Sequence, residues 1–325
     1  MLTYPASSET VRDERPSYRP YRATVARIVQ VSPSFKRVTF TGEEFETFGT
    51  AGLDQRIKVV LPHADGGYGE CGWFDPEVLA AGTWYQRWRE LDESERNPFR
   101  TYTVRAIRQA ERELDVDFVV HDEGHDAPAG PAAAWLAGAE EGDEIVIVGP
   151  DDLSVDYRLG LDWRPGDAID YLLAGDETAA PAICSILESL PAGTRAHAFI
   201  EVPHPDDAID ISTDADVSVT WLGRASGGLG LQDAVRAWVG EHRDRIAPAL
   251  AETEQELADI DVDVEMLWDS PEPDSEHPSA NFYAWLAGES ACIKALRRLL
   301  VTEVGVDRHR VAFMGYWRLG KAEAQ

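Results

Sequence analysis

The chain has 325 residues, enough for two domains that each bury a core of their own. Its formal net charge of −29, from 59 acidic and 30 basic residues, argues against nucleic acid or an anionic membrane surface as a partner. No apolar run approaches the roughly 20 residues that span a bilayer, and the polar opening does not resemble a secretory signal. We therefore expect a cytoplasmic protein without stable membrane association; its oligomeric state stays open, with a monomer as the working expectation.

The first half of the sequence predicts short strands. Residues 22–32, 36–42, 56–62, 100–107 and 113–122 are alternating runs rich in β-branched residues, separated by turn signals. Residues 66–98, rich in Gly, Trp and Tyr, are long for a loop, and we expect a short helix or lid there. A helix at 131–139 and a last strand at 144–150 come next in the chain. Short strands with turn signals indicate a small antiparallel β-barrel.

The second half alternates strands with helices. Strands are predicted at 167–175, 195–202, 217–223, 281–288 and 310–317, and helices at 178–190, 231–242 and 290–305. Apolar strands joined by helices are typical of an open parallel sheet. The acidic, proline-interrupted stretch 242–280 is interpreted as an insertion. The predicted domains are 18–155 and 165–325.

The stretch HDEGHDAPAGPAAAW, residues 121–135, has two interpretations. His121 and His125, with Asp122 and Asp126 beside them, have the spacing of metal ligands on a helix. However, residues 113–120 predict a strand, and Gly124 and Pro128 would break a helix after it, so a metal site is disfavoured. Residues 130–133, Gly-Pro-Ala-Ala, instead resemble the small-residue start of a helix that binds an anion. Cys71, Cys184 and Cys292 form no CxxC pair and signal neither a disulfide framework nor a metal site.

The stretch RTYT, residues 100–103, is the most specific local pattern. On a strand, Arg100 and Tyr102 share a face, where an arginine pairs with phosphate and a tyrosine stacks on a flat ring. In a parallel sheet, ligands bind beyond the carboxyl ends of the strands. The residues there are Gly175 to Thr178, Glu201, Gly223-Arg224 and Gly288-Glu289. For Gly175 to Thr178, a simple helix-capping turn is the alternative to a phosphate site.

Together these features resemble the siderophore-interacting, or ferric-siderophore reductase, family of the ferredoxin-NADP reductase superfamily. The motifs RTYTVR, FVVHD before GPAAAW, AGDETAAPAI, WLGR, YAWLAGE and GYWRLG occur in the family's order over roughly residues 20–320. The resemblance implies an N-terminal antiparallel FAD-binding β-barrel and a C-terminal α/β domain whose open parallel sheet binds NADPH or NADH.

The resemblance also implies roles for individual residues. The FAD site would comprise Arg100, Tyr102, Thr103, Arg105, His121, Asp122, Gly130, Ala132 and Ala133. The nicotinamide dinucleotide would lie over Gly175, Asp176, Glu177, Thr178, Glu201, Trp221, Arg224, Glu289, Tyr316 and Trp317. Arg224 is suited to the 2′-phosphate of NADPH and Glu201 to the ribose 2′-hydroxyl of NADH, and the choice stays open with a slight preference for NADPH.

The implied reaction is hydride transfer from NAD(P)H to FAD, then single-electron transfer to Fe(III) in a siderophore, which releases Fe(II). No protein acid or base is required, so we name no catalytic residue. Basic residues offered to an anionic ferric siderophore are Lys58, Arg318 and Lys321, with Arg56, Arg297 and Arg298 as further candidates. The alternatives are a flavin reductase with another acceptor, such as ferredoxin, oxygen or a ferric chelate, and a non-enzymatic siderophore-binding protein.

The excess of acidic residues raises the question of whether the protein is stabilised by high salt. A high-salt cytoplasm would screen the self-repulsion of such a chain, whereas an acidic mesophilic protein is the alternative. If the protein is halophilic, thermal melting should shift upward as KCl is raised to molar concentration. Equal melting temperatures at low and molar KCl would contradict that interpretation.

Overall fold

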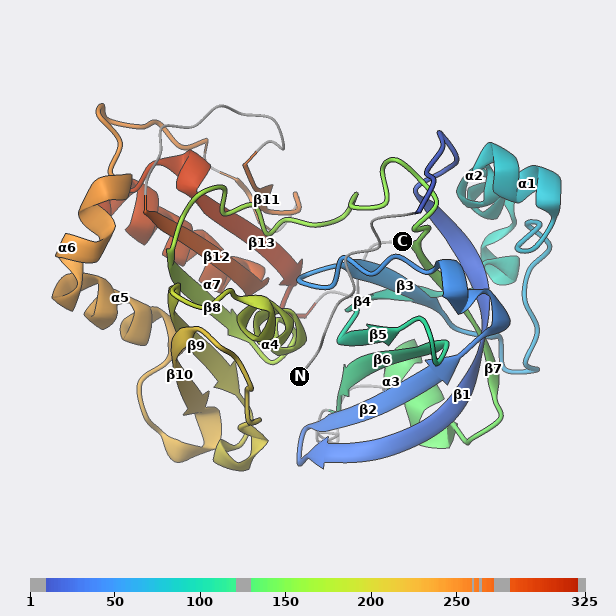
Figure 1. The fold of residues 1–325 in the computed structure, drawn as a ribbon. Coiled ribbons are helices and arrows are strands. Elements are labelled where there is room, and N and C mark those ends of the chain that lie inside the picture. Colours follow the sequence, from blue (N-terminus) through green and yellow to red (C-terminus); the bar gives the residue numbers. More distant parts are fainter. Residues whose placement is uncertain (1–9, 121–129, 259, 263–264, 272–280, 321–325) are drawn as a thin grey trace. The chain divides into compact units, whose positions relative to one another are not determined.

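A computed structural model describes residues 10–120, 130–258, 260–262, 265–271 and 281–320 (Figure 1). The chain divides into two compact units: the first extends to Leu161, except that Ser32–Ser34 group with the second, which begins at Asp162. In the described part of the chain, no helix combines the length and the apolar character needed to cross a membrane.

The first unit is built on a seven-stranded sheet, in the strand order β4-β3-β7-β1-β2-β6-β5 (Figure 1). Its strands are β1 (Tyr18–Ser32), β2 (Phe35–Thr41), β3 (Arg56–Val60), β4 (Phe99–Thr103), β5 (Ala106–Arg108), β6 (Glu113–Val119) and β7 (Glu144–Pro150). The pairings of β1 with β7, β2 with β6 and β3 with β4 are antiparallel. The predicted antiparallel barrel is confirmed as a curled half-barrel.

The connection between β4 and β5 shows that this sheet is curled. Strands β4 and β5 are adjacent in the chain, yet they lie at opposite ends of the strand order. Between them, Val104 N donates to Gln55 O at 2.9 Å and Arg105 N donates to Asp115 O at 2.9 Å. The single strand predicted for residues 100–107 is therefore wrong: the chain changes partners at Val104 and Arg105, which connect the two ends of the sheet.

The half-barrel encloses a core of aliphatic and aromatic side chains, among them Tyr21, Val38, Phe40, Val59 and Phe118. The irregular stretch 66–98 contains two short helices, α1 (Pro76–Ala81) and α2 (Trp84–Glu90), which confirms the helix expected there. Val78 of α1 and Trp84 and Trp88 of α2 form a second core with Trp73 and with side chains of β3, β4 and β7. Further elements are the 3-10 turns η1 (Glu43–Thr47) and η2 (Glu93–Glu95) and the helix α3 (Pro131–Gly138).

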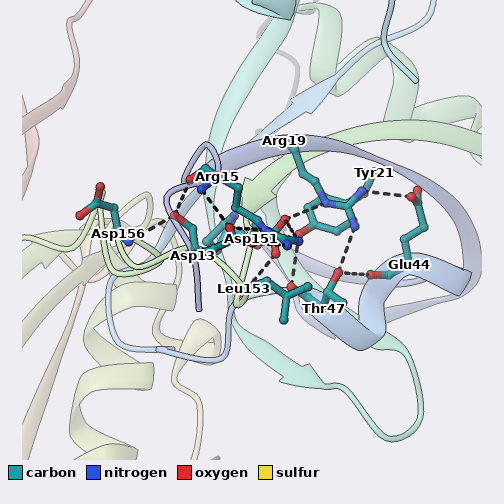
Figure 2. Close-up of polar contacts among 11 residues, drawn as sticks. Asp13, Arg15, Arg19, Tyr21, Glu44, Thr47, Asp151, Leu153 and Asp156 are labelled. Atoms are coloured by element: carbon teal, nitrogen blue, oxygen red, sulfur yellow. Dashed lines mark hydrogen bonds and ion pairs between the residues drawn. The ribbon is translucent and has the colours of Figure 1, made fainter. Parts of the chain in front are cut away.

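The residues before β1 are attached to the segment after β7 (Figure 2). Asp151, 4% exposed, lies within ion-pair distance of Arg19 (3.3 Å) and Arg15 (3.9 Å). Arg19 also binds Glu44 at 3.0 Å and stacks over the ring of Tyr21, 4.0 Å from its centroid. These contacts place residues 13–21 inside the first folding unit.

The second unit is built on a six-stranded sheet in the order β10-β9-β8-β12-β13-β11. Its strands are β8 (Asp170–Asp176), β9 (Arg195–Val202), β10 (Asp216–Gly223), β11 (Trp268–Asp269), β12 (Phe282–Glu289) and β13 (Val311–Trp317). Neighbouring strands from β10 to β13 are parallel, as predicted. The short edge strand β11, which lies within the predicted insertion, pairs with β13 in the antiparallel sense.

Helices cover both faces of this sheet. α5 (Leu231–Glu241) and α7 (Ser290–Arg297) share a core with Leu172 and Ala174 of β8. α4 (Ala180–Ser189) lies on the other face of the sheet. Gly175 follows Ala174 in β8 and so faces the opposite way, and a Cβ at Gly175 would approach Ala179 and Ile183 of the α4 region. The helix predicted over 290–305 continues after α7 as a π-helix, η6 (Arg298–Val304). The remaining elements are η3 (Pro205–Asp207), η4 (Arg224–Ser226), α6 (Arg243–Ile246), η5 (Ala247–Ala249) and η7 (Arg308–Arg310).

An ion-pair network on the half-barrel predicts a pH-dependent stability. Arg27 binds both carboxylate oxygens of Glu113 at 2.7 Å, and Arg108 adds a bond of 2.8 Å. The hydrogen bonds from Arg27, with a smaller effect of those from Arg108, lower the pKa of Glu113 to about 2, although burial opposes them. This contribution to stability is present above the ordinary pKa of 4.5 and disappears as the pH falls through 2.

Glu113→Gln should therefore lower the free energy of unfolding by about 1 kcal/mol at pH 7, because it removes a partly exposed ion pair. The difference from the unsubstituted protein should shrink between pH 4.5 and 2. Urea denaturation over this pH range measures it. Glu111→Gln, in the exposed turn before β6, is the matched control and should show no such trend. A Glu113→Gln effect that does not change with pH would contradict the assignment.

Candidate functional site

The RTYT stretch forms β4, and its pairing defines two faces. Lys58 of β3 pairs with Thr101, so these two side chains share one face, and Arg100 and Tyr102 point to the other. The Tyr102 ring lies 4.3 Å from the Phe118 ring, between centroids, and packs against the barrel core. Arg100 is partly buried and donates to Phe99 O at 2.8 Å. The predicted shared face of Arg100 and Tyr102 therefore agrees with the strand register.

Helix α3 is held beside this strand by the same aromatic residue. Trp135 of α3 lies 5.7 Å from Phe118 and 6.3 Å from Phe40, between ring centroids. Phe118 thus contacts Tyr102 on one strand and Trp135 on the helix, and it brings the RTYT motif and the Gly130 to Ala133 turn into one region. Trp135 itself packs against the barrel core.

The first turn of α3 has the features of an anion-binding helix start. Its N-cap is Gly130, and no side chain caps it among the described residues. A Cβ at Gly130 would meet no atom of the described segments within 4 Å, and Ala133 is exposed. Pro131 occupies the first helical position, where its missing N–H is not needed. The backbone amides of this turn are therefore approachable by a phosphate.

Other residues proposed for the flavin site have different surroundings. Thr103 and Arg105 are buried, at 6% and 5% exposure. Arg105 Nε lies 3.6 Å from Asp117, a carboxylate that also binds Arg37. Arg105 thus lies in a buried charge cluster of the barrel, and a supporting position is more consistent with this geometry than direct phosphate contact. His121 and Asp122 lie outside the described residues.

The second unit aligns its candidate residues along one edge of the sheet. Asp176 of β8 is in register with Glu201 of β9, and Glu289 of β12 is in register with Trp317 of β13. These positions are the carboxyl ends of parallel strands, where the sequence predicted them to meet. Gly175, at the same edge, is required for packing: a Cβ there would lie 2.5 Å from Ala179 Cβ and 2.6 Å from Ala287 O.

A buried carboxylate connects three of these strand ends. Asp176 is 5% exposed and accepts hydrogen bonds from Thr178 N (2.9 Å), Glu289 N (2.7 Å) and Trp317 Nε1 (2.8 Å). Burial and the neighbouring Glu177 raise the pKa of Asp176, and the donated hydrogen bonds oppose that shift. Asp176 is therefore an internal anchor that fixes the Trp317 indole and the start of α7.

A second cluster of charges lies at the ends of β8, β9 and β10. Both terminal nitrogens of Arg224 bind Glu177, at 2.8 and 2.6 Å, and Nη1 lies 3.3 Å from Glu201. Glu177 is 2% exposed, so its carboxylate serves Arg224. The sequence predicted all three residues as cofactor contacts but not that Arg224 binds both carboxylates. The adjacency of the three strand ends was the available signal.

The remaining predicted residues are less closely connected. Tyr316 stacks on Trp268, with 5.8 Å between ring centroids. Trp221 of β10 and Arg318 after β13 are partly exposed. Lys58 lies on the opposite face of the β3-β4 pair from Tyr102, 4.5 Å above the Phe99 ring. Lys321 lies outside the described residues.

Sequence reasoning also missed Phe118, the aromatic contact shared by Tyr102 and α3. Its alternating strand marked it as a core residue, but nothing in the sequence linked it to either motif. Among the further basic candidates, Arg297 is 6% exposed and binds Asp269 at 2.8 Å, so it is not available to an external anion.

Both halves of the chain are similar to known proteins. Residues 24–153 match the siderophore-interacting FAD-binding domain, and residues 168–320 match the siderophore-interacting protein family. An uncharacterized protein of Mycobacterium tuberculosis is 34% identical over 90% of this chain and 88% of its own. The ferric vibriobactin reductase ViuB of Vibrio cholerae is 29% identical over 90% and 87%. The NADPH-dependent ferric-chelate reductase of Escherichia coli is 24% identical over 90% and 91%.

Solved structures show the same two-domain fold. The siderophore-interacting protein SipS from Aeromonas hydrophila superposes with a TM-score of 0.61, 28% identity and 95% coverage of both chains. A ferredoxin-NADP+ reductase from Plasmodium falciparum shares the fold at 10% identity, with a TM-score of 0.56 over 90% and 94% of the two chains. The architecture, the order of the motifs and these matches establish that the chain belongs to the siderophore-interacting protein family.

Proposed function

We propose that this protein is an FAD-dependent ferric-siderophore reductase that takes a hydride from NAD(P)H and delivers single electrons to siderophore-bound Fe(III). The observation that carries the proposal is that Phe118 contacts both Tyr102 of the RTYT strand and Trp135 of α3, a helix whose N-cap Gly130 has no side-chain cap among the described residues, within a family FAD-binding domain. The ferric reductases among its relatives support the acceptor.

The described residues fit a flavin dinucleotide. Arg100 and the amides of Ala132 and Ala133 would hold its diphosphate, and Tyr102 would cover its ring system. The small side chains of the α3 first turn leave the backbone accessible. Bound FAD would supply the conversion of a two-electron donor into single-electron steps. His121 and Asp122 remain predicted neighbours of its nucleotide portion.

The second unit would bind and orient the nicotinamide dinucleotide at the carboxyl edge of its sheet. Asp176 holds Trp317 in place there, so an aromatic side chain is fixed at the end of β13. Gly175 to Thr178, Glu201, Trp221, Arg224, Glu289 and Tyr316 complete the proposed site. We name no acid or base, because hydride and electron transfer require none from the protein.

The ferric siderophore is the substrate of the proposed reaction. Arg318 and Lys321 are the residues proposed to attract a ferric siderophore, which carries hard oxygen donors. Lys58 is not retained, because it lies on the face of the β3-β4 pair opposite Tyr102. Reduction lowers the charge on the metal, so these donors bind Fe(II) more weakly than Fe(III) and the iron is released. Each hydride supplies electrons for two Fe(III) ions.

The flavin site is tested by substitution in α3. Ala133→Glu, at an exposed position, and Ala132→Glu, where the side chain also packs against the barrel core, each introduce a carboxylate into the turn proposed to bind the diphosphate, and each should weaken FAD binding by at least about tenfold. Flavin absorbance of the purified protein and titration with FAD measure this. Ala134→Glu is the control, because Ala134 N already donates to Gly130 O at 2.9 Å. Unchanged FAD retention in folded Ala132→Glu protein would remove the diphosphate site, and protein that binds no FAD at all would remove the reductase proposal.

Turnover tests the acceptor. Under anaerobic conditions, NADH or NADPH with a ferric siderophore and an Fe(II) chelator should yield about two Fe(II) per nicotinamide oxidised. Flavin that is reduced without any siderophore-dependent Fe(II) would favour a flavin reductase with another acceptor.

A further inference from the structure

The charge cluster at the ends of β8, β9 and β10 bears on which nicotinamide dinucleotide the site accepts. Arg224 is the cation there that is suited to a 2′-phosphate. Its two terminal nitrogens bind both oxygens of Glu177, and Nη1 also lies 3.3 Å from Glu201 Oε1. The guanidinium is thus paired with two internal carboxylates.

The balance of charge in this cluster is negative. Two carboxylates, Glu177 and Glu201, surround one guanidinium, which leaves one net negative charge. Glu177 is 2% exposed, and its departure from Arg224 would leave a buried carboxylate without its cation. An incoming phosphate would therefore meet repulsion from both carboxylates and compete with them for Arg224.

Glu201 also binds the N-terminus of helix α5, the second feature at this edge that would attract a phosphate. Its other oxygen, Oε2, accepts from Leu231 N at 2.9 Å, at the first residue of the 11-residue helix α5. The N-cap of α5 is Gly230, which has no side chain to provide this bond. One carboxylate therefore binds the arginine and caps the helix, as an external phosphate would do in its absence.

We infer that Glu201 makes this protein select NADH over NADPH. The inference rests on the proposed reductase function and concerns the adenosine end of its second substrate. A ribose 2′-hydroxyl can donate to Glu201 without disturbing its bonds to Arg224 and Leu231 N. A 2′-phosphate must displace Glu201 from both partners and then lie beside two carboxylates.

The direct test is nucleotide binding, which requires no electron transfer. Isothermal titration should show 5′-AMP binding more tightly than 2′,5′-ADP, which differs from it by the 2′-phosphate. Glu201→Gln removes one negative charge and loosens the hold on Arg224, so the affinity for 2′,5′-ADP relative to 5′-AMP should rise by about tenfold or more. Glu201→Asp, which keeps the charge, should retain most of the preference for 5′-AMP.

A matched control separates this local effect from the overall charge of the protein. Glu303 binds Arg236 of α5 at 2.8 Å in an exposed pair, so Glu303→Gln removes the same charge from a similar contact elsewhere on the unit. It should leave the ratio of the two affinities unchanged. Rapid-mixing measurement of flavin reduction by NADH and by NADPH should give the same pattern in all variants.

The possible outcomes distinguish failure of the NADH preference from failure of the proposed reductase function. If neither nucleotide binds and neither NADH nor NADPH reduces the flavin, the proposed function itself fails, and the inference fails with it. If the flavin is reduced but NADPH is used as well as or better than NADH, the function stands and the inference is overturned. The protein could also prefer NADH and keep that preference unchanged in both Glu201→Gln and Glu303→Gln. That result would overturn the role of Glu201.

Discussion

The buried carboxylate of Asp176 is the constraint on which the second unit's candidate site depends. It joins the ends of β8, β12 and β13 through hydrogen bonds from Thr178, Glu289 and Trp317. Gly288 must be glycine for this arrangement, because its φ is +149° and a Cβ would lie 2.6 Å from Asp176 Oδ2. A buried carboxylate is costly unless donors surround it, so these strand ends are fixed together as a set.

The sequence was sufficient for the architecture because periodicity reports local burial. Alternating runs predicted the barrel strands, and apolar runs between helices predicted the parallel sheet. The partner change at Val104 and Arg105 was not visible, because it depends on contacts with Gln55 and Asp115, which are distant in sequence. The antiparallel edge strand β11 was hidden for a similar reason: two residues carry no period.

The sequence predicted which residues lie at the candidate site better than it predicted the contacts among them. Residues named from strand ends do lie in register at one edge of the sheet. What the pattern could not predict is which of them bind each other, because partner choice depends on distances between chain segments. Arg224 is the clearest case: the sequence indicated a cation for an external ligand, whereas in the structure its partly exposed side chain pairs with Glu177 and Glu201. The opposite faces of Lys58 and Tyr102 result from a register that only the pairing of β3 with β4 defines.

The contacts around Asp151 have a practical consequence for defining the flavin-binding domain. The family match begins at residue 24 and ends at residue 153, whereas Arg15, Arg19 and Tyr21 lie before it. Tyr21 is fully buried, and its hydroxyl donates to Pro150 O at 2.8 Å. A fragment cut at the limits of the match would remove both arginines from the Asp151 carboxylate and Tyr21 from the core. The first compact unit is therefore longer at its N-terminal side than the region that sequence similarity delimits.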